Sequence, residues 1–270
     1  MSNSSKNSSR HILHDYIINP PHRITVTIIG CGGTGSQVLS IVARMHISLL
    51  ALGHPGFSVT VYDHDTVSEA NYGRQLFTMN DIGLNKAVVS VTRINRAYGL
   101  DWKAVPAKAT KLNGNIIISC VDKIASRREI NNGIAHNRQS ESNNNREDSC
   151  FYWLDFGNGY DTGQAILGSY GNESVKLLDF FDIYPELKKG FVKNDNTEDS
   201  CSLAQALGKQ DLLVNPLIAN LGMGLLWRLF REGTTEYNGV ILNLKSFEST
   251  SIKIKSTKND TATAKKQVPR

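Results

Sequence analysis

A glycine-rich turn gives the clearest chemical signal in this sequence. The apolar run Ile24–Ile29 is followed by Gly-Cys-Gly-Gly-Thr-Gly and then by apolar residues at helical spacing. Such a turn lets the backbone approach a ligand closely, and the helix that follows presents N–H groups to an anion. By itself the turn does not distinguish NAD, FAD, S-adenosylmethionine and ATP. The glycines that we predict to line the phosphates are Gly30, Gly32, Gly33 and Gly35.

Two carboxylates follow a second predicted strand, Phe57–Tyr62. Asp63 stands at the strand end, where a carboxylate accepts hydrogen bonds from both hydroxyls of a ribose; a solvated acidic residue is the alternative. The spacing from Gly30 to Asp63 is longer than the roughly 20 residues usual for this fingerprint, and a connection with glycine and proline accommodates the difference. Asp65 caps the loop or shapes the part of it that carries Arg74, and we include it among the candidate nucleotide-binding residues.

Four polar residues further along are difficult to explain by hydride transfer. An enzyme that cleaves ATP at the α-phosphate must neutralise charge on the phosphoryl oxygens and on pyrophosphate, whereas a nicotinamide enzyme has no such need. Arg74 and Gln75 suit that role, and Lys86 supplies a second cation. Asp122, just past the predicted strand Ile116–Ser119, is suited to hold Mg²⁺ with its waters. Taken singly, each charge has the alternative of a plain surface residue.

Alternating strands and helices predict the framework that positions these groups. The pattern favours an α/β, Rossmann-like fold, with a mostly parallel open sheet and helices on both faces. A helix is predicted over Met79–Ala97, with Asn80 or Asp81 as its N-cap and Lys86 near its start. Another helix is predicted over Ile124–Ile134, and a polar surface loop is expected to follow it.

Antiparallel strands are expected towards the C-terminus. Phe151–Phe156 and Gln164–Leu167 are predicted strands joined by a glycine-rich turn. Val240–Leu244 and Ser251–Ile254 are predicted to form a closing hairpin. Between these pairs, Asn215 followed by proline predicts the N-cap of an amphipathic helix that ends before Gly233.

The pattern of composition along the chain predicts a single domain with irregular ends. Residues 1–23 form a partly disordered N-terminal arm, and 256–270 form a disordered basic tail. The α/β domain spans residues 24–255, with mobile loops expected near 136–150 and 188–200.

Bulk composition excludes several classes of protein. Forty per cent of the 270 residues are apolar, which is enough for a sizeable core. The net charge of +5 is small and lies partly in the tail, so nucleic-acid binding is not indicated. The four cysteines form no C-x-x-C pair, so neither structural zinc nor a disulfide framework is expected. With no signal peptide or membrane-spanning run visible, we expect no membrane association and a cytoplasmic location.

In combination, the motifs resemble those of the E1-like adenylating proteins, which include ThiF, MoeB, HesA and the ubiquitin-activating enzymes. The matching segments are GCGGTGS, DHDTVSEANYGRQ, GLNKA and SCVD, and they cover about Ile24 to Asp122 in order. A later segment, from Cys201 into the predicted helix that follows, resembles the family more weakly. Within the family, the chain resembles the ThiF-family member of the PRTRC plasmid cassettes.

The resemblance implies an ATP-dependent adenylation. In this family the C-terminal carboxylate of a small β-grasp, ubiquitin-like or sulfur-carrier protein attacks the α-phosphate of ATP, and pyrophosphate leaves. By motif, the glycines would line the phosphates, Asp63 would hold the ribose and Asp122 would coordinate Mg²⁺. The side chains that the resemblance assigns to the triphosphate are Asn71, Arg74, Gln75 and Lys86. It also implies a homodimer.

The sequence departs from the family at its cysteines. Many relatives carry two C-x-x-C pairs for structural zinc, and this chain has none. Many also pass the activated carboxyl group to a cysteine. Cys201 is the candidate nucleophile here, and an unreactive cysteine on a connecting loop is the alternative. Two other functions stay open, an NAD(P)-dependent oxidoreductase and a non-catalytic nucleotide-binding scaffold of a plasmid-maintenance system.

Overall fold

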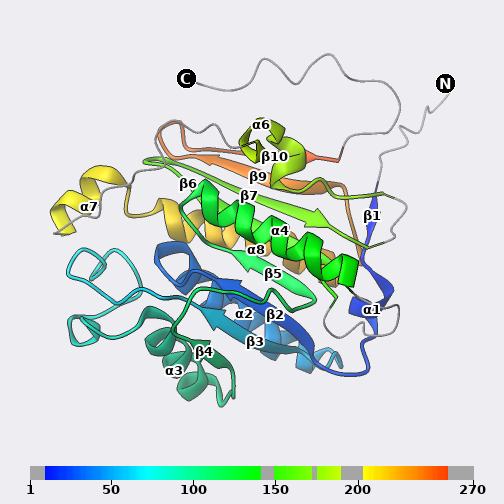
Figure 1. Ribbon diagram of the computed structural model, residues 1–270, viewed down its shortest axis with the longest axis horizontal. Helices are drawn as coiled ribbons and strands as arrows, with labels where there is room; N and C mark the ends of the chain where they lie inside the picture. Colours follow the sequence, from blue (N-terminus) through cyan, green and yellow to red (C-terminus); the bar gives the residue numbers. More distant parts are fainter. Residues whose placement is uncertain (1–9, 141–148, 172–174, 190–202, 255–270) are drawn as a thin grey trace.

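The computed structural model describes residues 10–140, 149–171, 175–189 and 203–254. Its centre is an eight-stranded sheet in the order β10-β9-β7-β6-β5-β2-β3-β4 (Figure 1). Strands β4, β3, β2, β5 and β6 run parallel, and β6, β7, β9 and β10 pair antiparallel. This confirms the predicted fold class, including the antiparallel strands towards the C-terminus.

The bounds of the elements place the predicted motifs at their ends. The strands are β1 (His11–Ile12), β2 (Ile24–Ile29), β3 (Phe57–Tyr62), β4 (Lys103–Val105), β5 (Ile116–Ser119), β6 (Tyr152–Asn158), β7 (Thr162–Ser169), β8 (Thr234–Thr235), β9 (Tyr237–Asn243) and β10 (Glu248–Lys253). The helices are α1 (Asp15–Ile18), α2 (Gly33–Ala51), the 3-10 turn η1 (Met79–Asp81), α3 (Lys86–Tyr98), α4 (Ile124–Ser140), α5 (Phe180–Ile183), α6 (Pro185–Lys188), α7 (Leu203–Lys209) and α8 (Val214–Glu232). None of these described helices combines the length and the hydropathy needed to cross a membrane.

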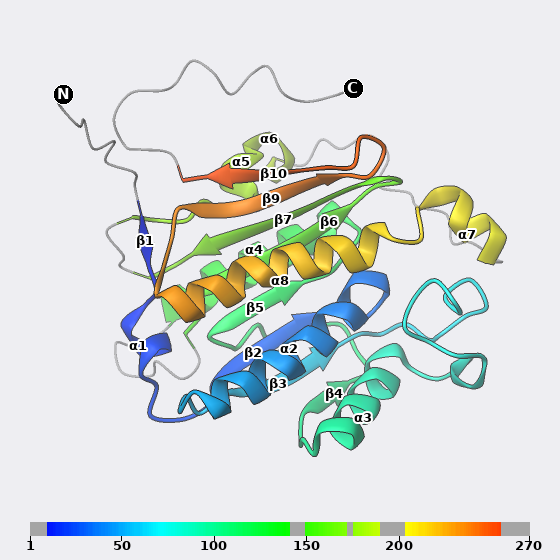
Figure 2. The same ribbon diagram turned by 180° about the vertical axis from the view of Figure 1, so that it is seen from behind.

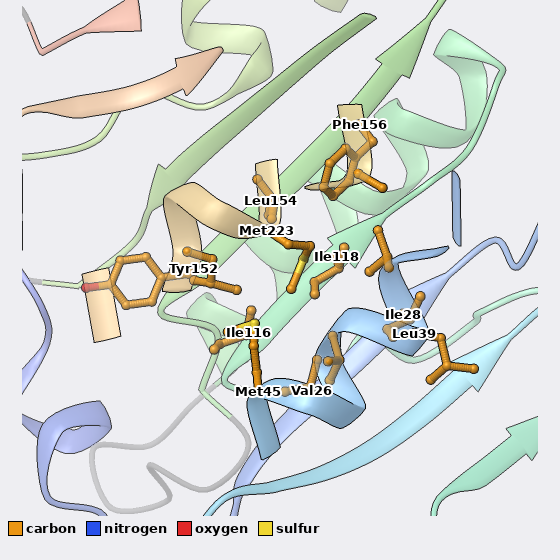
Figure 3. Packing of buried hydrophobic residues seen from close by; sticks show 14 of the residues in the cluster. Val26, Ile28, Leu39, Met45, Ile116, Ile118, Tyr152, Leu154, Phe156 and Met223 are labelled. Carbon is orange, nitrogen blue, oxygen red and sulfur yellow. The ribbon is translucent and has the colours of Figure 1, made fainter. Parts of the chain in front are cut away.

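The central strands are covered on both faces, which explains their continuous apolar sequences. Helices α2 and α8 cover one face of the sheet and α4 covers part of the other (Figures 1 and 2). Because successive side chains of a strand point to opposite faces, Ile116 and Ile118 pack in one core cluster and Ile117 in another. Figure 3 shows the cluster beneath α2 and α8, where Met223 lies among the strand side chains. A strand buried on both faces therefore carries apolar side chains at consecutive positions, as β5 does.

The predicted strands are confirmed, three of them to the residue. β2, β3 and β5 begin and end where the sequence predicts. β6 and β7 pair antiparallel across the predicted glycine-rich turn, and β9 and β10 form the predicted hairpin. The short edge strand β4 is a strand that the sequence analysis did not predict, because its three residues carry too weak a pattern.

The helix predicted to start at η1 begins later. Gly83 has a φ of 87°, which is incompatible with a right-handed helix, so the chain turns before α3 starts at Lys86. The N-cap is Asn85 and not the predicted Asn80 or Asp81. Its side-chain oxygen accepts a hydrogen bond of 3.1 Å from the backbone N–H three residues on.

Two further helix limits differ from the predictions. α4 continues to Ser140 instead of ending near Ile134, because a helix can persist where its exposed residues no longer show an apolar stripe. α8 starts at Val214 with Leu213 as its N-cap. Asn215, the predicted cap, lies inside the first turn and is almost completely buried.

The N-terminal arm packs on its own chain. β1 pairs antiparallel with β8, and the buried ring of His11 lies with Nε2 2.9 Å from the Tyr152 hydroxyl oxygen. The backbone N–H of His14 donates a hydrogen bond of 2.9 Å to the same hydroxyl oxygen. These contacts anchor the arm beside the amino end of β6.

Two glycines in α8 give a matched test of how closely this helix packs on the sheet. A Cβ at Gly222 would lie 2.6 Å from Cβ of Ala165 and would overlap the ring of Phe156, whereas a Cβ at Gly224 would meet nothing within 4 Å. We predict that Gly222→Ala lowers the free energy of unfolding by about 1–3 kcal/mol through overpacking. Gly224→Ala should raise it by up to about 1 kcal/mol through helix propensity. Denaturant unfolding measures both effects, and equal shifts would contradict this packing.

Candidate functional site

The carboxyl ends of three parallel strands meet at one edge of the sheet. β2 pairs with β3 on one side and with β5 on the other, so the order of the chain reverses between β2 and β5. Open α/β sheets bind ligands in the crevice outside the carboxyl ends of the strands at such a reversal. Each predicted site residue that the structure describes follows β2, β3 or β5, or begins α3.

The glycine turn lets α2 start directly against β5. Gly30 has a φ of 88°, and a Cβ there would lie 2.6 Å from the carbonyl oxygen of Cys120. A Cβ at Gly35 would overlap the carbonyl oxygen of Gly30. These two glycines therefore serve close packing, while Gly32 and Gly33 are partly exposed and remain accessible to a ligand.

Asp63 ties the glycine turn to the loop after β3. Its Oδ2 accepts a hydrogen bond of 2.6 Å from the backbone N–H of Cys31, and its Oδ1 accepts one of 2.9 Å from the N–H of Asp65. Hydrogen bonds to a carboxylate are among the stronger ones, so the two segments are held together. Each oxygen has a further lone pair, which leaves the predicted contact to a ribose chemically possible.

Asp65 and Lys86 form an ion pair at the same edge. The Lys86 ammonium lies 3.3 Å from Oδ2 of Asp65, and the Lys86 side chain is 11% exposed against 54% for Asp65. Asn85 reinforces this junction, because its side-chain nitrogen donates to the carbonyl oxygens of Asp63 at 2.9 Å and Asp65 at 3.0 Å. Asp65 thus holds the lysine in place, a contact that the sequence analysis did not predict.

A group of possible metal ligands also lies after β3. Asp63, His64 and Asp65 present ligand atoms that all lie within 4.8 Å of one another. The carboxylates of this group are already engaged, one by two backbone N–H groups and the other by Lys86. Asp122, the predicted Mg²⁺ ligand, is exposed at the end of the neighbouring strand β5 and is not a member of this group.

Arg74 and Gln75 lie opposite the glycine turn. Oε1 of Gln75 would be 3.7 Å from a Cβ placed on Gly32. Nη1 of Arg74 donates a hydrogen bond of 2.6 Å to Oε1 of Gln210, and burial lowers the pKa of the guanidinium. The buried atoms Nε of Arg74 and Oε1 of Gln75 have no hydrogen-bond partner in the described part of the chain. Buried polar atoms without a protein partner are expected to meet a ligand or water.

Asn71, which the resemblance assigns to the triphosphate, folds its own loop in this structure. Its Oδ1 accepts hydrogen bonds from the backbone N–H of Ser68 at 3.0 Å and from the Ser68 hydroxyl at 3.2 Å. Its backbone carbonyl oxygen accepts one of 2.9 Å from the N–H of Gln75. Asn71 therefore shapes the loop that presents Arg74 and Gln75, and its contact with a triphosphate stays a prediction.

The cysteines near the turn are structural. Burial raises the pKa of the Cys31 thiol to about 12. Burial also raises the pKa of Cys120 well above its usual range. Both thiols are therefore protonated near neutral pH, and neither provides a thiolate nucleophile. Cys201, the candidate nucleophile of the sequence analysis, lies outside the described residues.

A buried ion pair that the sequence analysis missed supports the end of β5. Nε of Arg127 lies 2.9 Å from Oδ2 of Asp155, and both residues are under 5% exposed. The same guanidinium donates to the carbonyl oxygens of Phe156 at 2.7 Å and Asp122 at 3.2 Å. Burial raises the pKa of Asp155, and the Arg127 charge opposes that shift. The pair thus holds the backbone that carries Asp122, and the aspartate within the apolar run FYWLDF was its only signal in the sequence.

A second missed cluster joins the glycine turn to Arg74. The Thr34 hydroxyl donates a hydrogen bond of 2.9 Å to Oδ1 of Asn215. Nδ2 of Asn215 donates one of 2.8 Å to Oε1 of Gln210. Nδ2 of Asn158 donates to the Thr34 hydroxyl oxygen at 3.0 Å and also to Oδ1 of Asn215. We call Thr34, Asn158, Gln210 and Asn215 the amide cluster. Its members come from three separate stretches of the chain, so no local sequence pattern reveals it.

Comparison with protein families and curated proteins identifies relatives of part of the chain. The ThiF family model matches residues 22–145, just under half of the 270 residues. Ubiquitin-like modifier-activating enzyme 5 of Oryza sativa subsp. japonica is 29% identical over 128 residues, covering 40% of this chain and 28% of that protein. The enzyme of the same name from Arabidopsis thaliana is 26% identical over 140 residues, covering 43% and 30%. The aligned part of the chain spans less than a third of the length of these relatives. The matches confirm the resemblance to E1-like proteins.

Solved structures share the fold over most of the chain. The crystal structure of E. coli MccB with succinimide superposes with a TM-score of 0.56 at 15% identity, covering 86% of this chain and 64% of MccB. PaaA gives 0.55 at 14% identity, with coverage of 86% and 64%. E. coli MccB with ATP gives 0.54 at 15% identity, with coverage of 89% and 65%. These similarities establish a common Rossmann-like architecture, in which this chain spans just under two thirds of the MccB chain.

Neighbouring arginines of α4 give a matched test of the buried ion pair. Arg127→Met leaves the buried carboxylate of Asp155 unpaired, and we predict a loss of about 3–5 kcal/mol of unfolding free energy. Arg128 is half-buried and its Nε donates 2.8 Å to the carbonyl oxygen of Leu187, so Arg128→Met should cost much less. Denaturant titration compares the two variants. A small loss in Arg127→Met, equal to that in Arg128→Met, would contradict a stabilising role for the pair.

Proposed function

We propose that this chain, in which residues 22–145 match the ThiF family model, is an E1-like enzyme that uses ATP to adenylate a small partner protein. The observation that carries the proposal is the pairing of a glycine turn with two cations at the carboxyl edge of a parallel sheet. Lys86 is linked to the turn through Asp65 and Asp63, and the loop of Arg74 lies opposite the turn. Such an arrangement suits cleavage of a triphosphate better than hydride transfer.

In the proposed reaction, an oxygen of the partner's C-terminal carboxylate attacks the α-phosphorus of ATP. A new oxygen–phosphorus bond forms, the bond from the α-phosphorus to the bridging oxygen breaks, and pyrophosphate leaves with the electron pair. The product on the partner is an acyl-adenylate. Negative charge grows on the phosphoryl oxygens and the leaving group, so fixed cations stabilise the transition state more than the ground state. This step needs no protein nucleophile.

Each candidate residue has a role in this scheme. The backbone at Gly32 and Gly33 approaches the phosphates, with Gly30 and Gly35 permitting the close packing behind it. Asp63 holds the ribose, and Asp65 orients the lysine. The side chains proposed to contact the triphosphate are Asn71, Arg74, Gln75 and Lys86.

Magnesium fits the exposed carboxylate at the end of β5. Asp122 stands on the strand next to the glycine turn, and Arg127 fixes its carbonyl oxygen. A carboxylate with open access to water is a typical partner for Mg²⁺, which keeps several waters when bound with phosphates. The ion would supply additional neutralisation of phosphate charge, and Asp122 would hold it.

The relatives support a nucleotide and a polypeptide partner. The curated plant relatives are named as enzymes that activate a ubiquitin-like modifier. MccB has been crystallised with ATP, and with AMPCPP together with MccA. We therefore propose a β-grasp, ubiquitin-like or sulfur-carrier protein as the partner, in a cytoplasmic setting. We further propose that the chain is of the same type as the ThiF-family member of the PRTRC plasmid cassettes.

We also propose that the enzyme works as a homodimer. Leu213, Leu217 and Leu221 recur every four residues at the start of α8, and all three are more than a third exposed. An apolar stripe on an amphipathic helix that faces solvent is typical of an interface. The N-terminal arm is less suited to this role, because β1 and His11 pack on the same chain.

Charged substitutions in this stripe test the dimer. Leu217→Lys together with Leu221→Lys should convert a dimer into monomers, because burying two ammonium groups in an apolar interface is unfavourable. Asn132→Lys is the control, since Asn132 is exposed on α4, which covers the opposite face of the sheet. Sedimentation velocity gives the oligomeric state. A wild-type chain that sediments as a monomer, or a double variant that stays dimeric, would contradict the proposed interface.

ATP–pyrophosphate exchange in the presence of the cognate carrier tests the activity. We predict that Arg74→Ala and Lys86→Ala each reduce the exchange rate about 100-fold or more, because each removes a fixed charge from the transition state. Arg96→Ala, an exposed arginine in the last turn of α3, should leave the rate unchanged. Circular dichroism shows whether each variant is folded.

Other outcomes of the exchange assay would favour other functions. Exchange that survives both substitutions would contradict the proposed site. ATP binding without pyrophosphate release for any carrier would favour the nucleotide-binding scaffold. Cys201→Ser should leave exchange intact, because we propose that this cysteine acts only after adenylation: its sulfur forms a thioester bond with the acyl carbon of the adenylate, and AMP leaves.

A further inference from the structure

We propose that Gln210 is a positioning residue for Arg74: its side-chain oxygen fixes the guanidinium relative to the glycine turn and leaves the positive charge of the arginine unneutralised. This inference rests on the proposed function, because the position of Arg74 matters for catalysis only if the arginine acts on a triphosphate. It concerns the connection between α7 and α8, to which the motifs of the sequence assign no role.

A chain of hydrogen bonds runs from Arg74 to the helix that follows the glycine turn. Oε1 of Gln210 accepts two hydrogen bonds, one of 2.6 Å from Nη1 of Arg74 and one of 2.8 Å from Nδ2 of Asn215. Oδ1 of Asn215 in turn accepts 2.9 Å from the hydroxyl of Thr34 in the first turn of α2. Asn215 is 1% exposed and Thr34 is 5% exposed, so the chain is shielded from water at that end. The position of Arg74 is thereby coupled to the position of α2.

The backbone around Gln210 is held against the turn between β6 and β7. The N–H of Asp211 donates a hydrogen bond of 2.7 Å to the carbonyl oxygen of Tyr160. The Nε2 of Gln210 approaches the carbonyl oxygen of Gly159 at 3.4 Å, which is a weak contact. Gln210 therefore reaches Arg74 from a segment that is itself fixed, as a positioning residue requires.

The choice of a neutral acceptor matters for the charge of the site. None of the described residues contributes a carboxylate to Arg74, whose Nη1 bonds to an amide oxygen instead. Arg127 of the same chain shows the contrast, because this buried structural arginine is paired with the carboxylate of Asp155 at 2.9 Å. An amide oxygen accepts one N–H without cancelling the guanidinium charge, so Arg74 retains its attraction for an anionic ligand.

A double-mutant cycle on ATP affinity tests the coupling between Gln210 and Arg74. Isothermal titration calorimetry would measure the dissociation constant for ATP in the full-length chain carrying Gln210→Met, Arg74→Ala or both. Methionine keeps the length of glutamine but lacks the acceptor. We expect Gln210→Met to raise the dissociation constant about 5- to 10-fold when Arg74 is present, which corresponds to the loss of one ordinary hydrogen bond. In the Arg74→Ala background the same change should alter it less than about 2-fold.

A charged substitution tests the second half of the inference. Gln210→Glu offers Arg74 a carboxylate of the same shape, which would pair with the guanidinium and compete with the phosphates. This variant should bind ATP more weakly than Gln210→Met does. A Gln210→Glu chain that binds ATP as tightly as the wild type would overturn the claim that the neutral partner is needed.

A control glutamine and the double-mutant cycle distinguish positioning of Arg74 by Gln210 from a general effect on stability. Gln205→Met, an exposed position on α7, should leave ATP affinity unchanged. A purely structural role for Gln210 would weaken ATP binding equally with and without Arg74, and that result overturns the inference. A wild-type chain that binds no ATP overturns the proposed function itself, whereas ATP binding that Gln210→Met leaves unaltered overturns only the role of Gln210.

Discussion

The close approach of the glycine turn to the end of β5 is the contact on which the site depends. Gly30 and Gly35 leave no room for side chains, and this lets α2 start against the backbone of Cys120. Because α2 starts there, the ends of β2, β3 and β5 converge, and Asp63 can bridge the turn to the next loop through Cys31. Any side chain at these two glycines would push the strand ends apart, and the cationic side chains would no longer lie close to the glycine turn.

Hydrogen bonds between distant segments then set the electrostatics of the edge. Two arginines near it have different kinds of partner: Arg127 is buried and paired with the carboxylate of Asp155, while Arg74 donates to the amide oxygen of Gln210. The first arrangement stabilises the backbone beneath Asp122, and the second keeps a positive charge available at the surface of the crevice. Lys86 stands between these extremes, because its partner Asp65 is half-exposed and its ion pair is weakened by solvent. Arg127 thus supports the strand ends, whereas Arg74 and Lys86 are the groups that we propose to bind an anion.

The sequence predicts the framework of this edge but not its supports. Strand β2 has a strong pattern because both of its faces are largely buried, and β3 has one because buried residues alternate with more exposed ones, so both strands could be predicted. Asp63 follows β3 directly and could be placed in advance. Lys86 was predicted near the start of a helix, but that helix begins at Lys86 itself and not at Met79. Asn215 was misread as a helix cap because an Asn-Pro pair has that local meaning, whereas its true partners lie 181 and 57 positions away at Thr34 and Asn158. Only tertiary structure brings such groups together, so short-range patterns do not reveal them.

A crystal structure of the chain with a non-hydrolysable ATP analogue, compared with a parallel NAD soak, tests the central claim most directly. The account predicts that the analogue binds at the carboxyl edge of the sheet, with its ribose at Asp63 and its triphosphate between the glycine turn and the side chains of Arg74 and Lys86. NAD bound in that crevice under conditions in which the ATP analogue does not bind would contradict the account and would favour an oxidoreductase.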